Sequence, residues 1–346
     1  MPYPTLPPRL DPQVTSSLLQ KAIRRGETEL AASAARLYNQ QRSHAVWLRL
    51  LTIAFEDVGI GDPDLVVEAA TYSLGRKVRK VWGEDDQLAG AFAGRLAKAP
   101  KDRSADHLYC AAVRHPDWKI AREVLEDGPL ETAMEIALDP DQLLMHRAIA
   151  VLRVCGPLDQ PSRHLPLLLS GLEQQGAPSE LMTATEIAAR RLQHPFVVMT
   201  ALAAAVRAAD GGKAVVQKVD LPPYPDLQGA PLYAWDKHTD LGRKAIRRLV
   251  GAQTSLRHQL VKHLPPRAVI PVTGMAVFHT ESALTSRPLV WSHTKALEAA
   301  GCQADLMKAG AGASAVGPVL TLINQNLPAL NQIRAGLLTP SGYPAS

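Results

Sequence analysis

Apolar and polar positions alternate at helical intervals near the start of the chain. Over residues 17–25, the apolar positions fall on one side of a helix with about 3.6 residues per turn, and the basic positions fall on the other. The apolar side comprises Leu18, Leu19, Ala22 and Ile23, and the basic side comprises Lys21, Arg24 and Arg25. Gly26 predicts the end of this helix, because glycine readily adopts the left-handed conformation common at helix C-termini.

The following segment predicts three more helices. Residues 27–38 are rich in alanine and poor in β-branched residues, which favours a helix. Ser43 suits the N-cap of another, whose apolar side comprises Val46, Trp47, Leu50, Leu51 and Ala54. Asp62 and Pro63 suit the N-cap and the first position of the next helix.

Helical periodicity continues from residue 102 to about residue 209. Turn signals interrupt it at Asp127-Gly128-Pro129, Asp139-Pro140, Gly156-Pro157 and Gly176-Ala177-Pro178. These intervals are short enough for successive helical hairpins. Because the segment shows no fixed repeat period, a globular helical array is favoured over a solenoid.

Composition supports a mainly α fold. Hydrophobic residues make up 46% of the chain and aromatic residues only 5%, which suits packing between Ala- and Leu-rich helices better than a β-sandwich. A chain of 346 residues exceeds the size at which single cores usually stop growing, so two units are expected. We predict a Pro-rich arm at residues 1–16, a helical domain at 17–210, a linker or surface loop at 211–232, and a helical or mixed C-terminal region at 233–346.

The C-terminal region has a less regular pattern. Residues 268–292 are rich in β-branched residues and predict one hairpin or an irregular extension. Residues 318–338 predict a final amphipathic helix with a break at Pro328. The segment Gly310-Ala311-Gly312-Ala313-Ser314-Ala315 matches a relaxed dinucleotide-binding fingerprint. No acidic residue follows Asp305, however, so no cofactor is predicted.

Three ordered segments carry a resemblance to a known family. They are Lys21-Ala22-Ile23-Arg24-Arg25-Gly26, Ala54-Phe55-Glu56-Asp57-Val58-Gly59-Ile60-Gly61-Asp62-Pro63 and Leu96-Ala97-Lys98-Ala99-Pro100-Lys101-Asp102. Through them, residues 17–109 resemble the helical C-terminal region of the replication-associated recombination AAA+ ATPase family, which is related to clamp loaders. The resemblance assigns structural motif positions to Gly26, Glu56, Asp57, Gly59, Asp62 and Pro63.

This resemblance implies a multi-helix array similar to a clamp-loader collar, which in that family serves as an oligomerisation module. A homo-oligomer is therefore expected, and a separately encoded AAA+ ATPase is a further partner that the resemblance suggests. ATPase activity is not expected, because such enzymes bind phosphates and Mg²⁺ through a G-x-x-x-x-G-K-[ST] loop. Here Gly211-Gly212-Lys213 is followed by alanine, and Arg207 occupies the required upstream glycine position.

The charge distribution allows DNA as a partner. The net charge is +5 and the isoelectric point is near 9.1. The candidate phosphate contacts are Lys21, Arg24, Arg25, Arg76, Lys77, Arg79, Lys80, Arg243, Lys244, Arg247 and Arg248. The last four share one side of a predicted helix whose other side is apolar, so they are suited to phosphate binding. An ordinary solvated helix face is the alternative.

The segment around Asp236 and His238 offers groups for metal binding or acid–base chemistry. In a helix, Asp236 and Asp240 would share a face and leave His238 on the opposite side, so a three-ligand site requires a loop. Thr239 or Asp240 also suits the N-cap of the following basic helix, and this structural interpretation is favoured. Contact of the loop with nucleic acid remains open as well.

Metal, disulfide and membrane sites are not predicted. His263, His279 and His293 lack the close pair spacing of zinc ligands. Three widely separated cysteines, Cys110, Cys155 and Cys302, predict reduced thiols. The sequence has no apolar run of about 18 residues and no signal peptide pattern, so a cytoplasmic protein without a membrane span is expected.

Three functions remain open from the sequence. The first is a non-catalytic accessory protein of DNA replication or repair that oligomerises through its helical domain and contacts nucleic acid through basic helix faces. The second is a helical scaffold for a separately encoded ATPase. The third is an enzyme with a site around Asp236 and His238, which convergence of these side chains in a pocket would favour.

Overall fold

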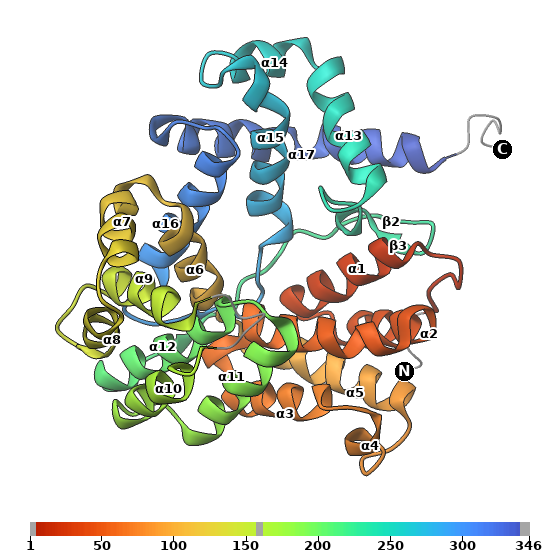
Figure 1. Ribbon diagram of the computed structural model, residues 1–346. Helices are drawn as coiled ribbons and strands as arrows, with labels where there is room; N and C mark the ends of the chain where they lie inside the picture. Colours follow the sequence, from red (N-terminus) through yellow and green to blue (C-terminus); the bar gives the residue numbers. More distant parts are fainter. Residues whose placement is uncertain (1–4, 157–161, 340–346) are drawn as a thin grey trace.

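The computed structural model describes residues 5–156 and 162–339 (Figure 1). Within these ranges the chain is mainly helical, as predicted, and its few strands are each two residues long. Residues 1–4 of the predicted arm, Pro157 of one predicted turn, and residues 340–346 lie outside the described residues.

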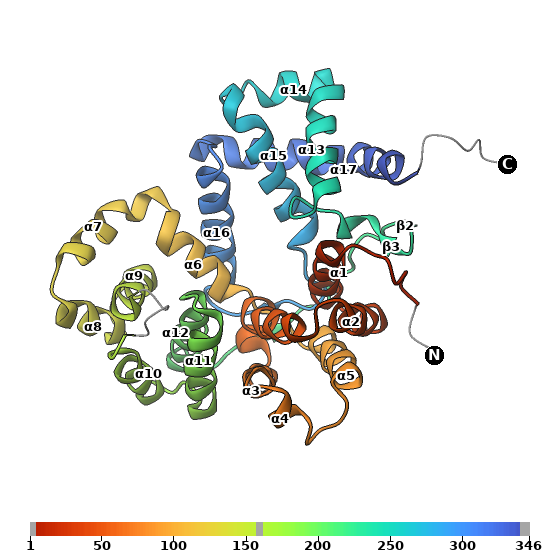
Figure 2. The same cartoon turned by 45° about the vertical axis from the view of Figure 1, so that its right-hand side comes forward.

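The first group of helices lies at the lower right of Figure 1. It comprises α1 (Pro12–Arg25), α2 (Thr28–Ile53), the π-helical turn η1 (Ala54–Val58), the 3₁₀ turn η2 (Gly59–Gly61), α3 (Pro63–Ser73), α4 (Arg76–Arg79) and α5 (Asp85–Lys98). Helix α2 packs against both α1 and α5. Helix α4 projects from the lower edge of the molecule (Figures 1 and 2).

The second group lies at the lower left of Figure 1 and shares one hydrophobic core with the first. It comprises α6 (Ser104–Arg114), the 3₁₀ turn η3 (Pro116–Trp118), α7 (Lys119–Asp127), α8 (Leu130–Leu138), α9 (Leu144–Cys155), α10 (Leu165–Gln174), α11 (Ser179–Leu192) and α12 (Phe196–Ala209). The predicted turns at 127–129, 139–140 and 176–178 separate consecutive helices, which confirms the expected helical array.

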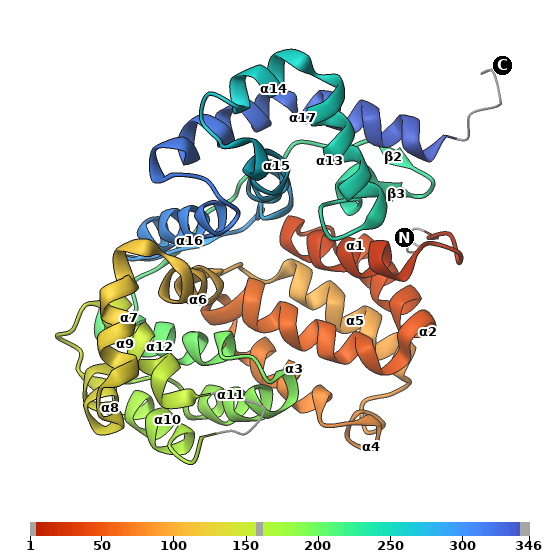
Figure 3. The ribbon, with the colours of Figure 1, turned by 45° about the horizontal axis from the view of Figure 1, so that its top comes forward.

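The third group stands above the other two and forms a second core from α13 to α17 (Figure 3). It comprises β1 (Val215–Val216), β2 (Asp226–Leu227), β3 (Ala230–Pro231), η4 (Leu232–Ala234), α13 (Asp240–Ala252), α14 (Thr254–Leu260), η5 (Pro266–Ala268), α15 (Val269–Val277), the π-helical turn η6 (Phe278–Ser282), β4 (Leu289–Val290), α16 (Thr294–Lys308), η7 (Ala313–Ala315) and α17 (Val316–Leu338). Helix α16 packs along α6 and so connects this group to the rest.

The N-terminal segment is more ordered than the predicted arm. Helix α1 begins at Pro12, ahead of the predicted boundary at residue 17, because the Asp11 side chain caps it by accepting a hydrogen bond from the backbone N–H of Gln13. Leu6 and Leu10 are buried in the first core. Residues 5–16 are therefore packed onto the helical body.

Helix α2, Thr28–Ile53, consists of two helices joined across a kink. The kink lies at Arg42, which has non-helical backbone angles (φ −143°, ψ 33°) and precedes the predicted cap Ser43. The two predicted helices are therefore present, but they are joined without an intervening loop. Burial on both sides of the kink, including Ala35 and Val46, holds the two halves against one core.

The prediction of a hairpin or an irregular extension at residues 268–292 is wrong for most of the segment. Most of this segment is the helix α15 and the turn η6, and only Leu289–Val290 forms a strand, paired antiparallel with β1. Val269 and Val272 are buried against the second core, and this packing outweighs the weak strand preference of β-branched residues. The pairing joins Val215 and Val216 of the 211–232 segment to Val290 and Leu289.

Helix α17 continues through Pro328 without a break. Its buried residues include Val319, Ile323 and Leu330, which pack in the second core and hold both sides of the proline in line. Within the described residues, no helix by itself has the length and apolar character needed to cross a membrane. Helix α16 and residues 313–338 meet that criterion only jointly, as a pair bent by 110°.

Candidate functional site

Lys21 lies inside the protein and not on an exposed basic surface. The residue is 3% exposed, and its Nζ lies 2.8 Å from Oδ2 of Asp236 and 2.5 Å from Oγ of Ser17. Burial lowers the pKa of Lys21 to about 8, although the neighbouring Asp236 acts in the opposite direction. The prediction of an exposed phosphate contact at Lys21 is therefore wrong, because its charge is balanced internally.

Arg24 is also buried and paired. It is 1% exposed, and its guanidinium donates to Asp57 at 2.6 Å and to Glu56 at 2.7 Å. Arg103 approaches the same oxygen of Asp57 at 3.1 Å. Burial and the adjacent Asp57 raise the pKa of Glu56. Arg24 is thus part of an internal ionic cluster, and its predicted role as a surface phosphate contact is wrong.

The remaining motif positions have structural roles. Gly26 has φ 75° and ends α1, while Asp62 caps α3, whose first residue is Pro63. Gly59 has φ 48°, and a Cβ added there would lie 2.9 Å from the carbonyl oxygen of Asp102. The two glycines adopt backbone conformations that other residues rarely adopt, and Asp62 and Pro63 start α3, so these positions fix the connections from α1 to α2 and from η2 to α3.

The Arg25 side chain is only 6% exposed and forms several contacts. Its guanidinium lies over the rings of Tyr224 and Tyr233, at 5.2 Å and 4.8 Å from their centroids, and its Nε donates to Glu27 at 2.9 Å. Arg25 therefore anchors the 211–232 loop onto α1, because cation–π contacts hold both tyrosines. The predicted phosphate contact at Arg25 would compete with these interactions.

The basic cluster at α4 is divided between surface and interior. Arg76, Lys77 and Lys80 are exposed. Arg79 is 2% exposed, forms a two-point contact with the Asp85 carboxylate at 2.9 and 3.0 Å, and lies over Trp47. Arg79 is thus a structural residue and not a free phosphate contact, which corrects the prediction at this position.

The basic face predicted on α13 is present. Arg243, Lys244, Arg247 and Arg248 are exposed, and Ala245, Ile246, Leu249 and Val250 on the other side are buried. Thr239 caps the helix by accepting a hydrogen bond from Gly242 N–H at 3.1 Å, which confirms the capping interpretation. Arg243 pairs with Asp240 and donates to the His238 carbonyl at 3.1 Å, so part of its hydrogen-bonding capacity is already used within the protein.

The other three cations of α13 line a shallow groove against α17, with a volume of about 710 Å³. We call it the basic groove, and its lining residues are Lys244, Arg247, Arg248, Gly251, Ala252, Ile333 and Gly336. Among the described residues that line it, none is acidic. Its small residues leave the surface open beside the three cations, so an extended anion can approach closely.

Asp236 and His238 come together, as the enzyme hypothesis requires. Asp236 is 2% exposed, and its Oδ2 lies 2.8 Å from Lys21 Nζ and 2.9 Å from Nδ1 of His238. Burial alone would raise the pKa of Asp236, but Lys21 and His238 together hold it far below its ordinary value. The carboxylate therefore stays ionised and fixes both neighbours. This arrangement also links α1 to the segment that precedes α13.

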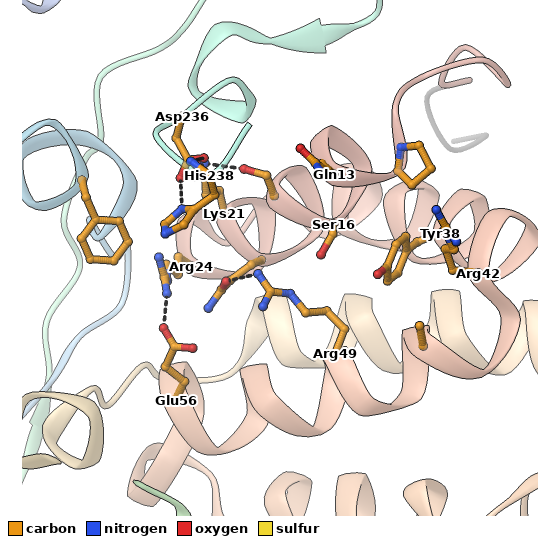
Figure 4. A pocket seen from close by; sticks show the side chains of 15 residues that line it. Gln13, Ser16, Lys21, Arg24, Tyr38, Arg42, Arg49, Glu56, Asp236 and His238 are labelled. Atoms are coloured by element: carbon orange, nitrogen blue, oxygen red, sulfur yellow. Dashed lines mark hydrogen bonds and ion pairs between the residues drawn. The ribbon is translucent and has the colours of Figure 1, made fainter. Parts of the chain in front are cut away.

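These side chains line one end of an open groove between α1 and α2, with a volume of about 700 Å³ (Figure 4). We call it the polar groove. Its other end is lined by Gln13 and Ser16 of α1 and by Tyr38, Arg42 and Arg49 of α2. None of the last three residues was predicted as a site residue. Their spacing of four and seven positions along α2, which places polar groups on one face, was the available signal.

The described residues contain no group of three or more His, Cys, Asp or Glu side chains arranged to hold a metal ion. His279 is instead buried beside Asp305, with Nε2 at 3.2 Å from Oδ2. Cys110, Cys155 and Cys302 are free thiols, as predicted. The basic groove and the polar groove thus each place basic side chains at an open surface. Comparisons with protein-family models, with curated proteins and with solved structures find no match to this chain.

Proposed function

We propose that this protein is a non-catalytic accessory protein of DNA replication or repair, which binds the phosphate backbone of DNA through the basic groove. The observation that carries the proposal is the set of three cations, Lys244, Arg247 and Arg248, in a groove whose described lining contains no carboxylate. Cations without internal counter-ions can neutralise phosphates and release the ions condensed on DNA.

The neighbouring surface supports this assignment. Arg243 extends the same helix face, although its pairing with Asp240 makes its contribution smaller. Phosphate contacts of this kind position a protein on DNA without reading its sequence, so the predicted binding is insensitive to base sequence. The exposed Arg76, Lys77 and Lys80 at α4 form a second basic surface.

The resemblance of residues 17–109 to a collar-like region supports an oligomeric assembly as part of the same proposal. We expect a homo-oligomer that presents several basic grooves to one DNA molecule, which would raise the overall affinity. Sedimentation of the purified protein tests this expectation. A monomer at all concentrations used for DNA binding would contradict it.

DNA binding is tested with the variant Lys244→Ala/Arg247→Ala/Arg248→Ala. Fluorescence anisotropy with labelled single-stranded, duplex and forked DNA is measured across a salt series. If the three residues contact phosphates, affinity falls for all sequences and the slope of log affinity against log salt becomes shallower by about 2–3, since each phosphate contact contributes about 0.9.

A matched control removes three cations elsewhere, in the variant Lys213→Ala/Lys218→Ala/Lys262→Ala. All three side chains are exposed and form no ion pair within the described residues. Its salt slope should stay close to that of the wild type. Equal losses in both triple variants would mean that net charge, and not the basic groove, determines binding.

A protein scaffold is a second candidate function, favoured by apolar exposure at α4. Leu74, Val81 and Trp82 are 49%, 81% and 53% exposed, next to the basic residues of that helix. Such a projecting patch suits docking to another protein, for instance a separately encoded ATPase. Partner binding that resists salt and is lost in Val81→Ser/Trp82→Ser would support this function.

Convergence of Asp236 and His238 in the polar groove favours an enzyme as a third candidate. His238 presents Nε2 outward, since Nδ1 faces Asp236, and 58% of its side chain is exposed. A purely structural role is the alternative, because the buried ion pair between Asp236 and Lys21 is sufficient to hold these side chains in place. If the protein is an enzyme with His238 in its active site, His238→Gln should abolish turnover of the substrate and leave DNA binding and the unfolding temperature unchanged.

A further inference from the structure

We propose that the polar groove between α1 and α2 binds a nucleotide unit, with the phosphate held by Arg42 and Arg49 and the base stacked on Tyr38. The unit is either a free nucleoside phosphate or part of a single nucleic-acid strand, since both present a phosphate beside a planar base. This site is separate from the basic groove and does not depend on the function proposed for it.

The two arginines provide uncompensated positive charge. Arg42 is exposed, and within the described parts of the chain its side chain forms no hydrogen bond or ion pair. Arg49 donates from Nη2 to the neutral Gln20 at 2.5 Å, and its buried Nε has no partner among the described residues. Guanidinium groups without carboxylate partners are suited to phosphate, which they can bind through two parallel hydrogen bonds.

The charges at the other end of the groove cancel internally. Lys21 is paired with Asp236, and Arg24 is paired with Glu56. His238 contacts the same Asp236. The net positive charge of the groove is therefore concentrated around Arg42 and Arg49, which determines where the anionic part of a ligand would lie.

Tyr38 supplies an aromatic surface beside this charge. It precedes Arg42 by one helical turn, or about 6 Å along the axis, and is only partly buried. Within the described residues its ring takes part in no aromatic or cation contact and its hydroxyl in no hydrogen bond. Stacking of a base on a free aromatic ring is favourable for every base, so this contact would not select sequence.

Helix α1 contributes hydrogen-bonding groups on the facing wall. Gln13 donates its backbone N–H to the Asp11 cap, and the described residues include no hydrogen-bond partner for the Gln13 side chain or the Ser16 hydroxyl. In Figure 4, Gln13 and Ser16 lie on α1 above Arg49 of α2, and Tyr38 and Arg42 of α2 lie together to the right. The groove thus combines cations, an aromatic ring and uncommitted polar groups, and this combination suits a nucleotide better than an inorganic anion alone.

The kink at Arg42 explains why the site is open. A straight helix would continue the close packing of α1 against α2, whereas the non-helical backbone at Arg42 turns the two halves of α2 relative to each other. The kink occurs where Arg42 enters the groove, so one backbone irregularity both opens the space and directs a cation toward it.

Calorimetric titration of the full chain with adenosine monophosphate, short oligothymidylate and inorganic phosphate tests the proposal. Wild type should bind at least one of the first two probes, and which one is bound identifies the source of the nucleotide unit. Arg42→Gln should weaken that binding by about 10- to 100-fold, because it removes a charged hydrogen-bonding partner of the phosphate. Arg42 has no internal partner, so this variant should keep the wild-type unfolding temperature.

Two further variants distinguish the base from the phosphate. Tyr38→Leu should weaken nucleotide binding by about fivefold or more while leaving inorganic phosphate unaffected. Arg257→Gln/Arg267→Gln, which removes two exposed arginines near α14, should bind as wild type does. The variant Lys244→Ala/Arg247→Ala/Arg248→Ala should also keep adenosine monophosphate binding, even if its duplex binding is lost.

Three results would overturn the inference. In the first, wild type binds neither adenosine monophosphate nor oligothymidylate. In the second, Arg42→Gln binds the nucleotide probe as tightly as wild type does. In the third, wild type binds phosphate and nucleotide with equal affinity, and Tyr38→Leu does not change either affinity. The response of adenosine monophosphate binding to Arg42→Gln and Tyr38→Leu does not bear on the basic groove, whose test is the salt dependence of DNA binding in Lys244→Ala/Arg247→Ala/Arg248→Ala.

Discussion

The ion pair between Arg334 of α17 and Glu281 of η6 provides a direct test of the packing in the second core. Both side chains are fully buried, and the two guanidinium nitrogens Nη1 and Nη2 donate to the two carboxylate oxygens at 2.7 and 2.8 Å. We predict that Arg334→Met lowers the free energy of unfolding by about 3–5 kcal/mol, because it leaves the Glu281 carboxylate buried without its counter-ion.

The expected thermal shift follows from the size of the protein. Unfolding entropy is about 2.1 cal/mol/K per residue near the transition, or about 0.7 kcal/mol/K for 346 residues. A loss of about 3–5 kcal/mol therefore lowers the unfolding temperature by about 4–7 °C. Circular dichroism at a helix-sensitive wavelength measures this shift, with urea unfolding as a second measurement.

The double variant Glu281→Gln/Arg334→Met tests the cause. It removes both charges, so most of the lost stability should return. Arg257→Met, at an exposed arginine of α14, is the matched control and should change stability by less than about 0.5 kcal/mol. The reasoning is refuted if Arg334→Met unfolds within about 1 °C of wild type. It is also refuted if the double variant is no more stable than the single one.

Three further perturbations have defined outcomes. Burial lowers the pKa of Lys101 to about 7 from its ordinary value of 10.5, so between these pH values the unfolded chain binds the additional proton and stability rises with pH. From pH 7 to pH 9, the stability of wild type should therefore rise by about 2–3 kcal/mol relative to that of Lys101→Met, as urea titrations would measure. A stability difference that stays constant with pH would contradict the lowered pKa of Lys101. Gly59→Ala should destabilise by more than about 1 kcal/mol in thermal unfolding, because φ is 48° and the added Cβ meets the carbonyl oxygen of Asp102 at 2.9 Å. Thr239→Ala should cost about 1 kcal/mol through loss of the α13 cap, whereas Thr239→Ser should retain most of it, as urea unfolding would show.

Predictions for the candidate site were correct where they depended on residues close in the sequence, and wrong where distant segments pack on the predicted surface. The exposed basic side of α13 follows from a helical period and a threonine cap, and both are present in the structure. Lys21 and Arg24 have the same basic-against-apolar pattern on α1, yet they are buried. The difference arises because loops and helices from the rest of the chain cover α1 and bring Asp236 to Lys21.

The sequence by itself determined the mainly helical fold, the end of α1 at Gly26, and the start of α3 at Asp62 and Pro63. These features depend on helical periodicity and on capping groups within a few residues of one another. The tertiary structure alone decided that residues 269–277 are helical, and that Tyr38, Arg42 and Arg49 face an open groove. The physical reason is that burial and charge balance depend on partners distant in the chain. The pair Lys21 and Asp236 illustrates this dependence, since neither position reveals the other before the chain folds.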